Sequence, residues 1–171
     1  MEKRIVYHQR GKDPLYKTWH ASKEHLFILF YSDGGSIVSN EQVFPIKKGT
    51  LVLIAANTYH YTMPDEPAIY DRSKLAVLPY ELDKISDLLS KSNIFKSFFD
   101  KAIVYAEIDE NDRDEVDGIF KEMNGCKSLN EELNLFSCLL RLRCFVDEYA
   151  IESTPDAIDF MSEATRYINE N

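Results

Sequence analysis

Hydrophobic and polar positions divide the chain into two parts of different character. Up to Leu78, short apolar runs of strand length alternate with turn residues, whereas beyond Pro79 apolar residues recur at helical spacing. Strands gathered in one part of a chain and helices in the other are typical of an α+β fold. The sequence therefore predicts an α+β protein whose strands precede its helices.

The first part predicts a β-sandwich or a small barrel. Its clearest strand covers residues 26–31 and is closed by residues 32–35, Ser-Asp-Gly-Gly, which form a hairpin signal. Residues 36–46 predict a strand pair bent near Asn40, and Pro45 places the second strand at a sheet edge. Three further strands are expected at residues 51–54, 59–63 and 68–78. Many short strands at regular spacing favour a sandwich or barrel.

The second part predicts a series of helices. Apolar residues at helical spacing indicate helices at residues 80–90 and 93–101. Asp109 can cap a third helix that ends at Asn124-Gly125. A capping box of Ser128 and Glu131 begins the fourth, which extends to about residue 150, and Thr154-Pro155 begins one more.

The fourth of these helices carries two apolar stripes instead of one. The first stripe consists of Leu135, Leu139, Leu142, Val146 and Tyr149. The second consists of Leu129, Leu133, Phe136, Leu140 and Cys144. A surface helix of a small domain needs one apolar face, so the extra stripe suggests a partner helix. We assign the dimer interface to the first stripe. The alternatives are that the second stripe forms the interface, or that the protein's own helices and strands bury both.

Composition narrows the classes of partner. At 171 residues the chain fits one domain, and its net charge of −9 argues against nucleic-acid binding by these residues. No long uncharged apolar run predicts a membrane span, and no apolar signal region follows the first residues, so we expect a cytoplasmic protein. The three cysteines fall in helical sequence without metal-site spacing and are expected to be buried, reduced thiols. The expected partner is a small molecule or another protein.

Candidate chemistry lies in the segment of residues 49–60. An apolar strand begins at Gly49 and leads through a polar turn to His60. This spacing resembles the second cupin motif, in which a barrel strand delivers a histidine into a central cavity. Ala55 occupies the motif's proline position and Asn57 its glycine position. Asn tolerates a left-handed backbone, so the turn is still expected. His60 is equally compatible with hydrogen bonding at the cavity rim.

The upstream cupin motif is largely lost. Aligned on Gly34, it places Phe27 where the family has a metal-binding glutamate, and Ser22 and His20 in the two histidine positions. Only His20 and His60 then remain of the four ligands. Since a catalytic metal normally takes at least three protein ligands, we expect no dedicated metal and no cofactor. Glu24 and His25 would add ligands if the alignment shifted by two or three residues.

The order of these features resembles the sensor domain of AraC-family transcriptional regulators. It comprises the cupin-like part, the strand at residues 70–79 with Arg72, the helices, and the terminal Tyr167-Ile-Asn-Glu-Asn171. The resemblance implies a cupin-like double-stranded β-helix barrel that binds an effector (residues 1–79) and a helical dimerisation segment (80–152). Residues 153–171 would be a linker helix leading to a helix-turn-helix DNA-binding domain that this sequence lacks. The implied partners are a sugar or related metabolite, a second copy, and promoter DNA through the missing domain only.

Position in the implied barrel selects the candidate ligand-binding residues. They are His20, Glu24, Phe27, Leu29, Tyr31, His60 and Thr62. Phe27, Leu29 and Tyr31 form one alternate set of their strand and are assigned to the cavity side because of the motif alignment. Tyr31 can stack on a sugar ring. Arg72 is expected to form a structural ion pair.

Two other functions remain open from the sequence. A metal-dependent cupin enzyme, an isomerase or dioxygenase acting on a small polar substrate, would need His20, His60 and either Glu24 or His25 around Fe, Mn or Zn. A pure dimerisation module would have its cavity filled by Phe27 and other large side chains. We predict the regulatory role rather than an enzyme.

Overall fold

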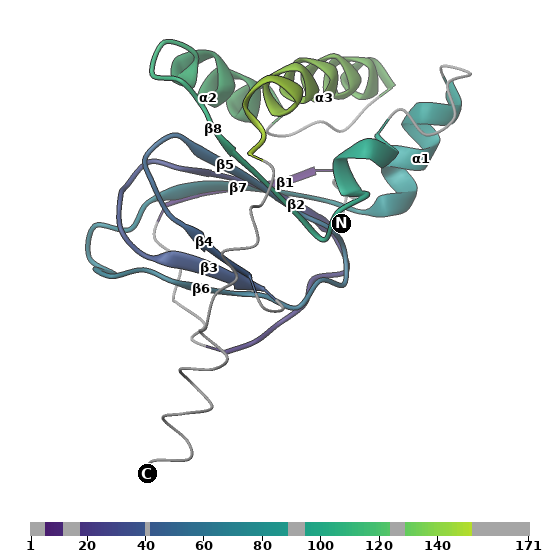
Figure 1. Ribbon diagram of the computed structural model, residues 1–171. Helices are drawn as coiled ribbons and strands as arrows, with labels where there is room; N and C mark the ends of the chain where they lie inside the picture. The colour runs from purple at the N-terminus through teal and green to yellow at the C-terminus, as the bar shows by residue number, and fades with distance from the viewer. Residues whose placement is uncertain (1–5, 12–17, 40–41, 89–94, 124–128, 152–171) are drawn as a thin grey trace.

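The computed structural model describes residues 6–11, 18–39, 42–88, 95–123 and 129–151, and these form three layers. Figure 1 shows a smaller sheet, a larger sheet above it, and the helices on the other face of the larger sheet. The arrangement confirms the α+β class. The described strands make two open sheets packed face to face. This differs from the closed double-stranded barrel expected from the cupin resemblance.

The larger sheet is antiparallel throughout, in the order β1-β7-β2-β5-β8. Its strands are β1 (Val6–Gly11), β7 (Arg72–Val77), β2 (His25–Phe30), β5 (Thr50–Ile54) and β8 (Ile103–Glu107). The smaller sheet has the order β4-β3-β6, with β4 (Gln42–Pro45), β3 (Ser36–Ser39) and β6 (Tyr61–Met63). Pro45 therefore lies on an edge strand, as predicted.

The helices are α1 (Pro79–Leu88), the short 3-10 helix η1 (Lys96–Phe99), α2 (Arg113–Glu122) and α3 (Leu129–Tyr149). Helix α2 begins later than predicted, because Asp112 rather than Asp109 is its N-cap residue. The helix predicted at residues 93–101 is reduced to η1 within the described residues. The helix predicted from Thr154 and the motif at residues 167–171 lie outside the described residues.

The glycine-rich turn at residues 32–35 joins the two sheets and does not close a hairpin. Strand β2 pairs with β5 and β7, and β3 pairs with β4 and β6. Gly34 and Gly35 have φ values of 96° and 109°. A Cβ on Gly35 would lie 2.4 Å from the carbonyl oxygen of Met63, so only glycine fits where the chain crosses between sheets.

Strand β2 supplies two separate cores, since both of its faces are covered. Leu26, Ile28 and Phe30 pack between the two sheets, in one cluster with Ile37 and Phe44 of the smaller sheet. The alternate residues Phe27 and Leu29, followed by Tyr31, pack on the helical side. The three residues that the motif alignment assigned to the cavity side of the barrel thus face the helices and not the space between the two sheets.

The first apolar stripe of α3 is largely part of the helix–sheet core. Leu135, Leu139 and Leu142 are fully buried and Val146 is 4% exposed, all in one cluster with residues of β2, β5 and α2. Tyr149 packs against the same cluster and its hydroxyl donates to Asp112 (2.6 Å). These side chains face the protein's own core, so the surface predicted for dimerisation is not presented by the folded chain.

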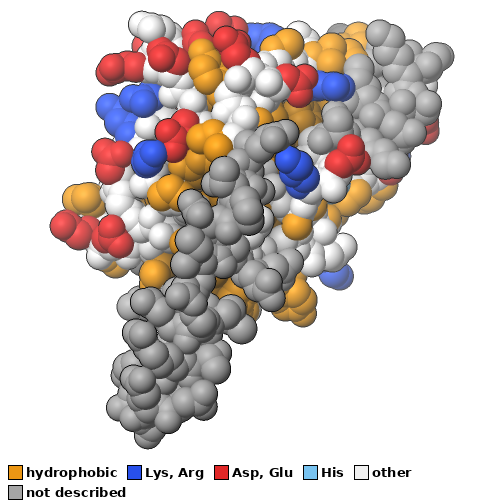
Figure 2. All heavy atoms as spheres, viewed as in Figure 1, with side chains coloured by type: hydrophobic (Ala, Val, Ile, Leu, Met, Phe, Trp, Pro, Cys, Tyr) orange, Lys and Arg blue, Asp and Glu red, His pale blue; other side chains and the backbone are white. Residues whose placement is uncertain are grey.

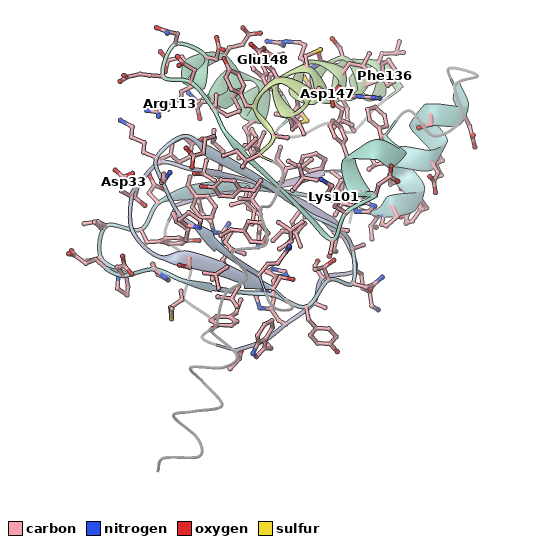
Figure 3. All side chains as sticks on the ribbon, in the orientation of Figure 1. Asp33, Lys101, Arg113, Phe136, Asp147 and Glu148 are labelled. Carbon is pink, nitrogen blue, oxygen red and sulfur yellow. The ribbon has the colours of Figure 1, made fainter. Side chains whose placement is uncertain are left out.

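The second stripe of α3 lies nearer the surface. Leu133 is 58% exposed and Cys144 is exposed, whereas Phe136 and Leu140 are partly buried. Phe136, labelled in Figure 3, packs edge-on against Phe95 with ring centroids 5.6 Å apart. Of the cysteines described, Cys138 is a buried free thiol as expected, and Cys144 is an exposed one.

Candidate functional site

The two histidines kept from the cupin pattern lie side by side. His20 and His60 form an isolated antiparallel bridge through two main-chain hydrogen bonds of 3.1 and 2.9 Å. Their ring centroids are 4.4 Å apart. His60 is 2% exposed and its Nδ1 lies 2.9 Å from the carbonyl oxygen of Thr58, while His20 is exposed. The two rings therefore meet where the segments that lead into β2 and β6 lie side by side.

The described residues offer this histidine pair no third metal ligand. Within them, no group of three or more His, Cys, Asp or Glu side chains is placed to hold a metal ion. Glu24 accepts a short hydrogen bond from the hydroxyl of Ser22, whose Oγ also accepts the main-chain N–H of Glu24. His25 points elsewhere. Its Nδ1 accepts a hydrogen bond from the N–H of Ala56 (3.1 Å), and its ring stacks on that of Phe99 with the ring centroids 3.6 Å apart. The turn itself is as predicted, with Asn57 at φ 63°.

Burial of the histidines makes stability depend on pH. Burial lowers the pKa of His25 to about 4, against an opposing effect of the Asp83 charge. Burial also lowers the pKa of His60, although its contact with the Thr58 carbonyl opposes the shift. The unfolded chain then binds more protons than the folded one between the usual histidine pKa of about 6.5 and these lowered values. The fold therefore loses stability as pH falls through that range.

We expect the urea midpoint to be lower at about pH 5 than at about pH 7, with His25→Gln reducing the difference. Above about pH 5 most carboxylates are still ionised, so the histidines dominate the change. Glu107, whose pKa is lowered chiefly by its hydrogen bond from Lys47, loses its contribution only at lower pH. Equal midpoints at both pH values would contradict the burial argument, and His20→Gln at the exposed ring is the matched control.

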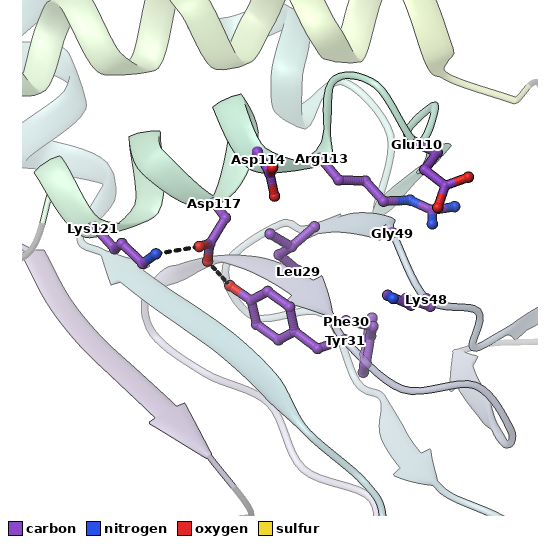
Figure 4. A pocket seen from close by; sticks show the side chains of 10 residues that line it. All are labelled: Leu29, Phe30, Tyr31, Lys48, Gly49, Glu110, Arg113, Asp114, Asp117 and Lys121. Carbon is purple, nitrogen blue, oxygen red and sulfur yellow. Dashed lines mark hydrogen bonds and ion pairs between the residues drawn. The ribbon is translucent and has the colours of Figure 1, made fainter.

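A cavity lined by several charged side chains lies between β2, the β4–β5 turn and α2. The cavity has a volume of about 550 Å³ and is open to solvent. Its floor is Leu29, Phe30 and Tyr31, and the remaining walls are Lys48, Gly49, Glu110, Arg113, Asp114, Asp117 and Lys121. We call it the α2 pocket; Figure 4 shows the side chains that line it, some on the sheet and some on α2 and the turn before it. Its volume is in the range typical of small-molecule sites.

Gly49 determines how Arg113 enters the α2 pocket. The glycine has φ 86°, its N–H donates to the Phe30 carbonyl (2.9 Å), and its own carbonyl accepts the N–H of Ile108 (3.1 Å). A Cβ at Gly49 would lie 2.2 Å from Arg113 Nε. The arginine side chain thus lies directly over the bare α-carbon, and its Nε donates to the Ile108 carbonyl (3.3 Å).

Tyr31 and Asp117 link the sheet to α2 at the floor of the pocket. The Tyr31 hydroxyl donates a short hydrogen bond to the Asp117 carboxylate and lies 2.9 Å from the hydroxyl of Ser73 in β7. Asp117 also pairs with Lys121 one turn further along α2, at 2.5 Å. Figure 4 draws both interactions of Asp117. The carboxylate is therefore compensated by a cation and a hydroxyl group.

The structure brings only part of the predicted ligand-binding set to this pocket. Leu29 and Tyr31 line it, whereas Phe27 is buried beneath η1 against Phe98 and Phe99. His20 and His60 meet at the other end of β2, with Glu24 preceding that strand. Thr62 pairs with Ile37 in the smaller sheet. Whether any of these residues contacts a ligand stays a prediction.

Sequence reasoning missed Lys48, Arg113, Asp114 and Lys121. Their separate charges carry no local motif, because each belongs to an ordinary turn or helix face. The available signal was Gly49, which the motif identified as a special backbone position without indicating that Arg113 would cover it.

Comparisons with known proteins identify the fold. No protein-family model and no curated protein matches the sequence. A structure of ToxT from Vibrio cholerae superposes with a TM-score of 0.53 at 9% identity, covering 98% of this chain and 66% of that one. Wild-type ToxT from strain SCE256 with a bound unsaturated fatty acid gives 0.51 at 13% identity, covering 98% and 62%. At these identities the likeness establishes a shared fold alone.

A further match is the AraC-like transcriptional activator CuxR, with a TM-score of 0.45 at 15% identity, covering 78% of this chain and 45% of that one. That score is too low to support a conclusion. The chain spans less than two thirds of the length of the ToxT chains it matches. No helix among the described residues is both long and apolar enough to cross a membrane.

Proposed function

We propose that the chain is the effector-sensing and dimerising domain of an AraC-family transcriptional regulator. The observation that carries the proposal is the agreement between two independent lines. The order of sequence motifs resembles that family's sensor domain, and the sheet–helix fold is shared with ToxT. Structures of ToxT have been solved with an unsaturated fatty acid and with a substituted butenoic acid, so the shared fold accommodates small organic ligands in that protein.

The α2 pocket is the effector site in this proposal. It joins groups from the sheet to groups on α2, and α2 packs along α3 through their shared core. A ligand that binds one placement of α2 better than another shifts the population toward that placement, by no more than its differential affinity. The surface that α3 presents would then differ between the ligand-bound and the ligand-free pocket.

Dimerisation is assigned to the second stripe of α3, because the first is buried in the core. Leu133 is the most exposed large apolar side chain described on that helix. Leu133→Ser is expected to weaken dimerisation by at least about tenfold, the loss of roughly one buried leucine contact. Sedimentation velocity over a concentration series measures the dimer constant.

The control is Ile69→Ser, which removes a side chain of similar exposure (55%) from the loop before β7. It should leave the dimer constant unchanged. If Leu133→Ser and Ile69→Ser behave alike, α3 is not the interface.

The regulatory role is tested by the intact mass of the protein in its source cells. A product larger than 19.8 kDa by roughly a hundred residues, one small domain, supports a regulator with a DNA-binding part. A product of 19.8 kDa would overturn that role and leave a stand-alone module.

A further inference from the structure

We propose that the α2 pocket recognises a small zwitterion of the amino-acid type, with the ligand's carboxylate on Lys48 and Arg113 and its ammonium group on Asp114 and Glu110. The inference rests on the proposed sensor function for its biological meaning and replaces the sugar expected from the family resemblance. The binding chemistry itself depends only on the pocket.

The cationic side of the pocket is built from two separate segments. Arg113 is the first residue of α2 and is held over Gly49 by its Nε–Ile108 hydrogen bond. Lys48 lies in the turn before β5, where its N–H donates to the Asp33 carboxylate (2.8 Å). Within the described part of the chain, neither cationic side chain forms an ion pair. Both charges are therefore available to an anionic group of a ligand.

The acidic groups of the pocket come from α2 and from the turn that precedes it. Asp114 is the second residue of α2 and Glu110 precedes the helix, and both line the pocket. Among the described residues no ion pair involves either carboxylate. Asp117, in contrast, is already compensated by Lys121 and Tyr31. Two carboxylates thus remain for a cationic group.

A pocket with charges of both signs selects against ligands that carry only one. A simple anion drawn to Lys48 and Arg113 would also approach Asp114 and Glu110, and a simple cation would meet the two basic groups. A ligand with separated charges of both signs can pair with the basic and the acidic groups at once. Figure 2 shows acidic and basic side chains intermixed on the visible surface. Tyr31, which is only partly buried, adds an aromatic ring for the ligand's side chain, and about 550 Å³ accommodates an amino acid.

The experiment is a thermal-shift and calorimetry screen of the standard free L-amino acids against the chain. Each amino acid that binds is compared with its N-acetyl derivative, which lacks the cation, and its amide, which lacks the anion. The free amino acid is expected to bind at least about tenfold more tightly than either derivative, since each derivative leaves one pair of charges unmatched.

Substitutions locate the binding. Lys48→Gln should weaken binding of the free amino acid and leave binding of the amide unchanged, whereas Asp114→Asn should leave the N-acetyl derivative unchanged. Lys23→Gln, at an exposed position beyond the opposite end of β2, is the control. All three positions are at the surface and leave the core intact.

Binding by no free amino acid, binding of either derivative as tight as that of the free amino acid, or pocket variants that match Lys23→Gln would each overturn the proposal. Failure of the regulatory role is a different result: charge-dependent amino-acid binding in the pocket of a protein whose intact mass is 19.8 kDa would refute the regulator and keep the pocket.

Discussion

Leu139→Ala is expected to lower the free energy of unfolding by about 3 kcal/mol. The leucine is fully buried in the core cluster that α3 shares with the larger sheet and α2, so truncation leaves a cavity within that cluster. Urea denaturation followed by circular dichroism measures the change, as a lower midpoint at constant slope.

The comparison is with Leu133→Ala on the same helix. Leu133 is 58% exposed, so its truncation should change the free energy of unfolding by no more than about 0.5 kcal/mol, measured at low protein concentration to keep the chain monomeric. Both substitutions remove the same atoms from a leucine of α3, and both change the helix propensity equally. Similar small losses for both would place the first stripe at a surface, contrary to the structure.

Gly49→Ala is expected to cost about 2 kcal/mol of folding free energy and to displace Arg113 from the α2 pocket. A residue with a Cβ at φ 86° is strained by roughly 1–2 kcal/mol, and the new Cβ would lie 2.2 Å from Arg113 Nε. Urea denaturation gives the stability. The crystal structure of the variant gives the position of the arginine.

Two further variants separate strain from collision. Gly49→Ala in an Arg113→Ala background should lose only the backbone strain, because the colliding side chain is gone. Gly118→Ala is the opposite control: this glycine is in α2, nothing lies within 4 Å of an added Cβ, and the change should stabilise the helix by roughly 0.5–1 kcal/mol. A neutral Gly49→Ala would show that the turn relaxes freely.

The sequence was sufficient for the fold class, several strands and the long helix, but it did not determine which face of β2 meets which layer. All residues of β2 after His25 are buried, because sheet and helices cover both of its faces. The alternation of apolar and polar residues shows which face of a strand is buried only when the other face is exposed to solvent. The orientation of β2 was therefore predicted from the motif alignment, which placed Phe27 on the cavity side of the barrel. In the structure it is Leu26 that packs between the two sheets.

The same limit applied to α3. Both apolar stripes were recognised in the sequence. Which of them the sheet covers depends on contacts between residues distant in sequence, so the stripe buried in the core could not be predicted. Strand β8 was missed because its five residues lie between segments with helical spacing. The α2 pocket could not be predicted from the sequence for a related reason. Lys48 and Arg113 come together only because β8 pairs with β5 and brings α2 over Gly49.

The β5–β8 pairing also determines where the chain can be truncated without exposing a sheet edge. The predicted boundary at residue 79 would remove β8 and expose the hydrogen-bonding edge of β5, whose five residues are all buried in the intact fold. An unpaired apolar edge of this kind is a template for strand addition from another chain. The first 79 residues expressed alone would therefore tend to aggregate, and the helical part is needed to keep the sheet soluble.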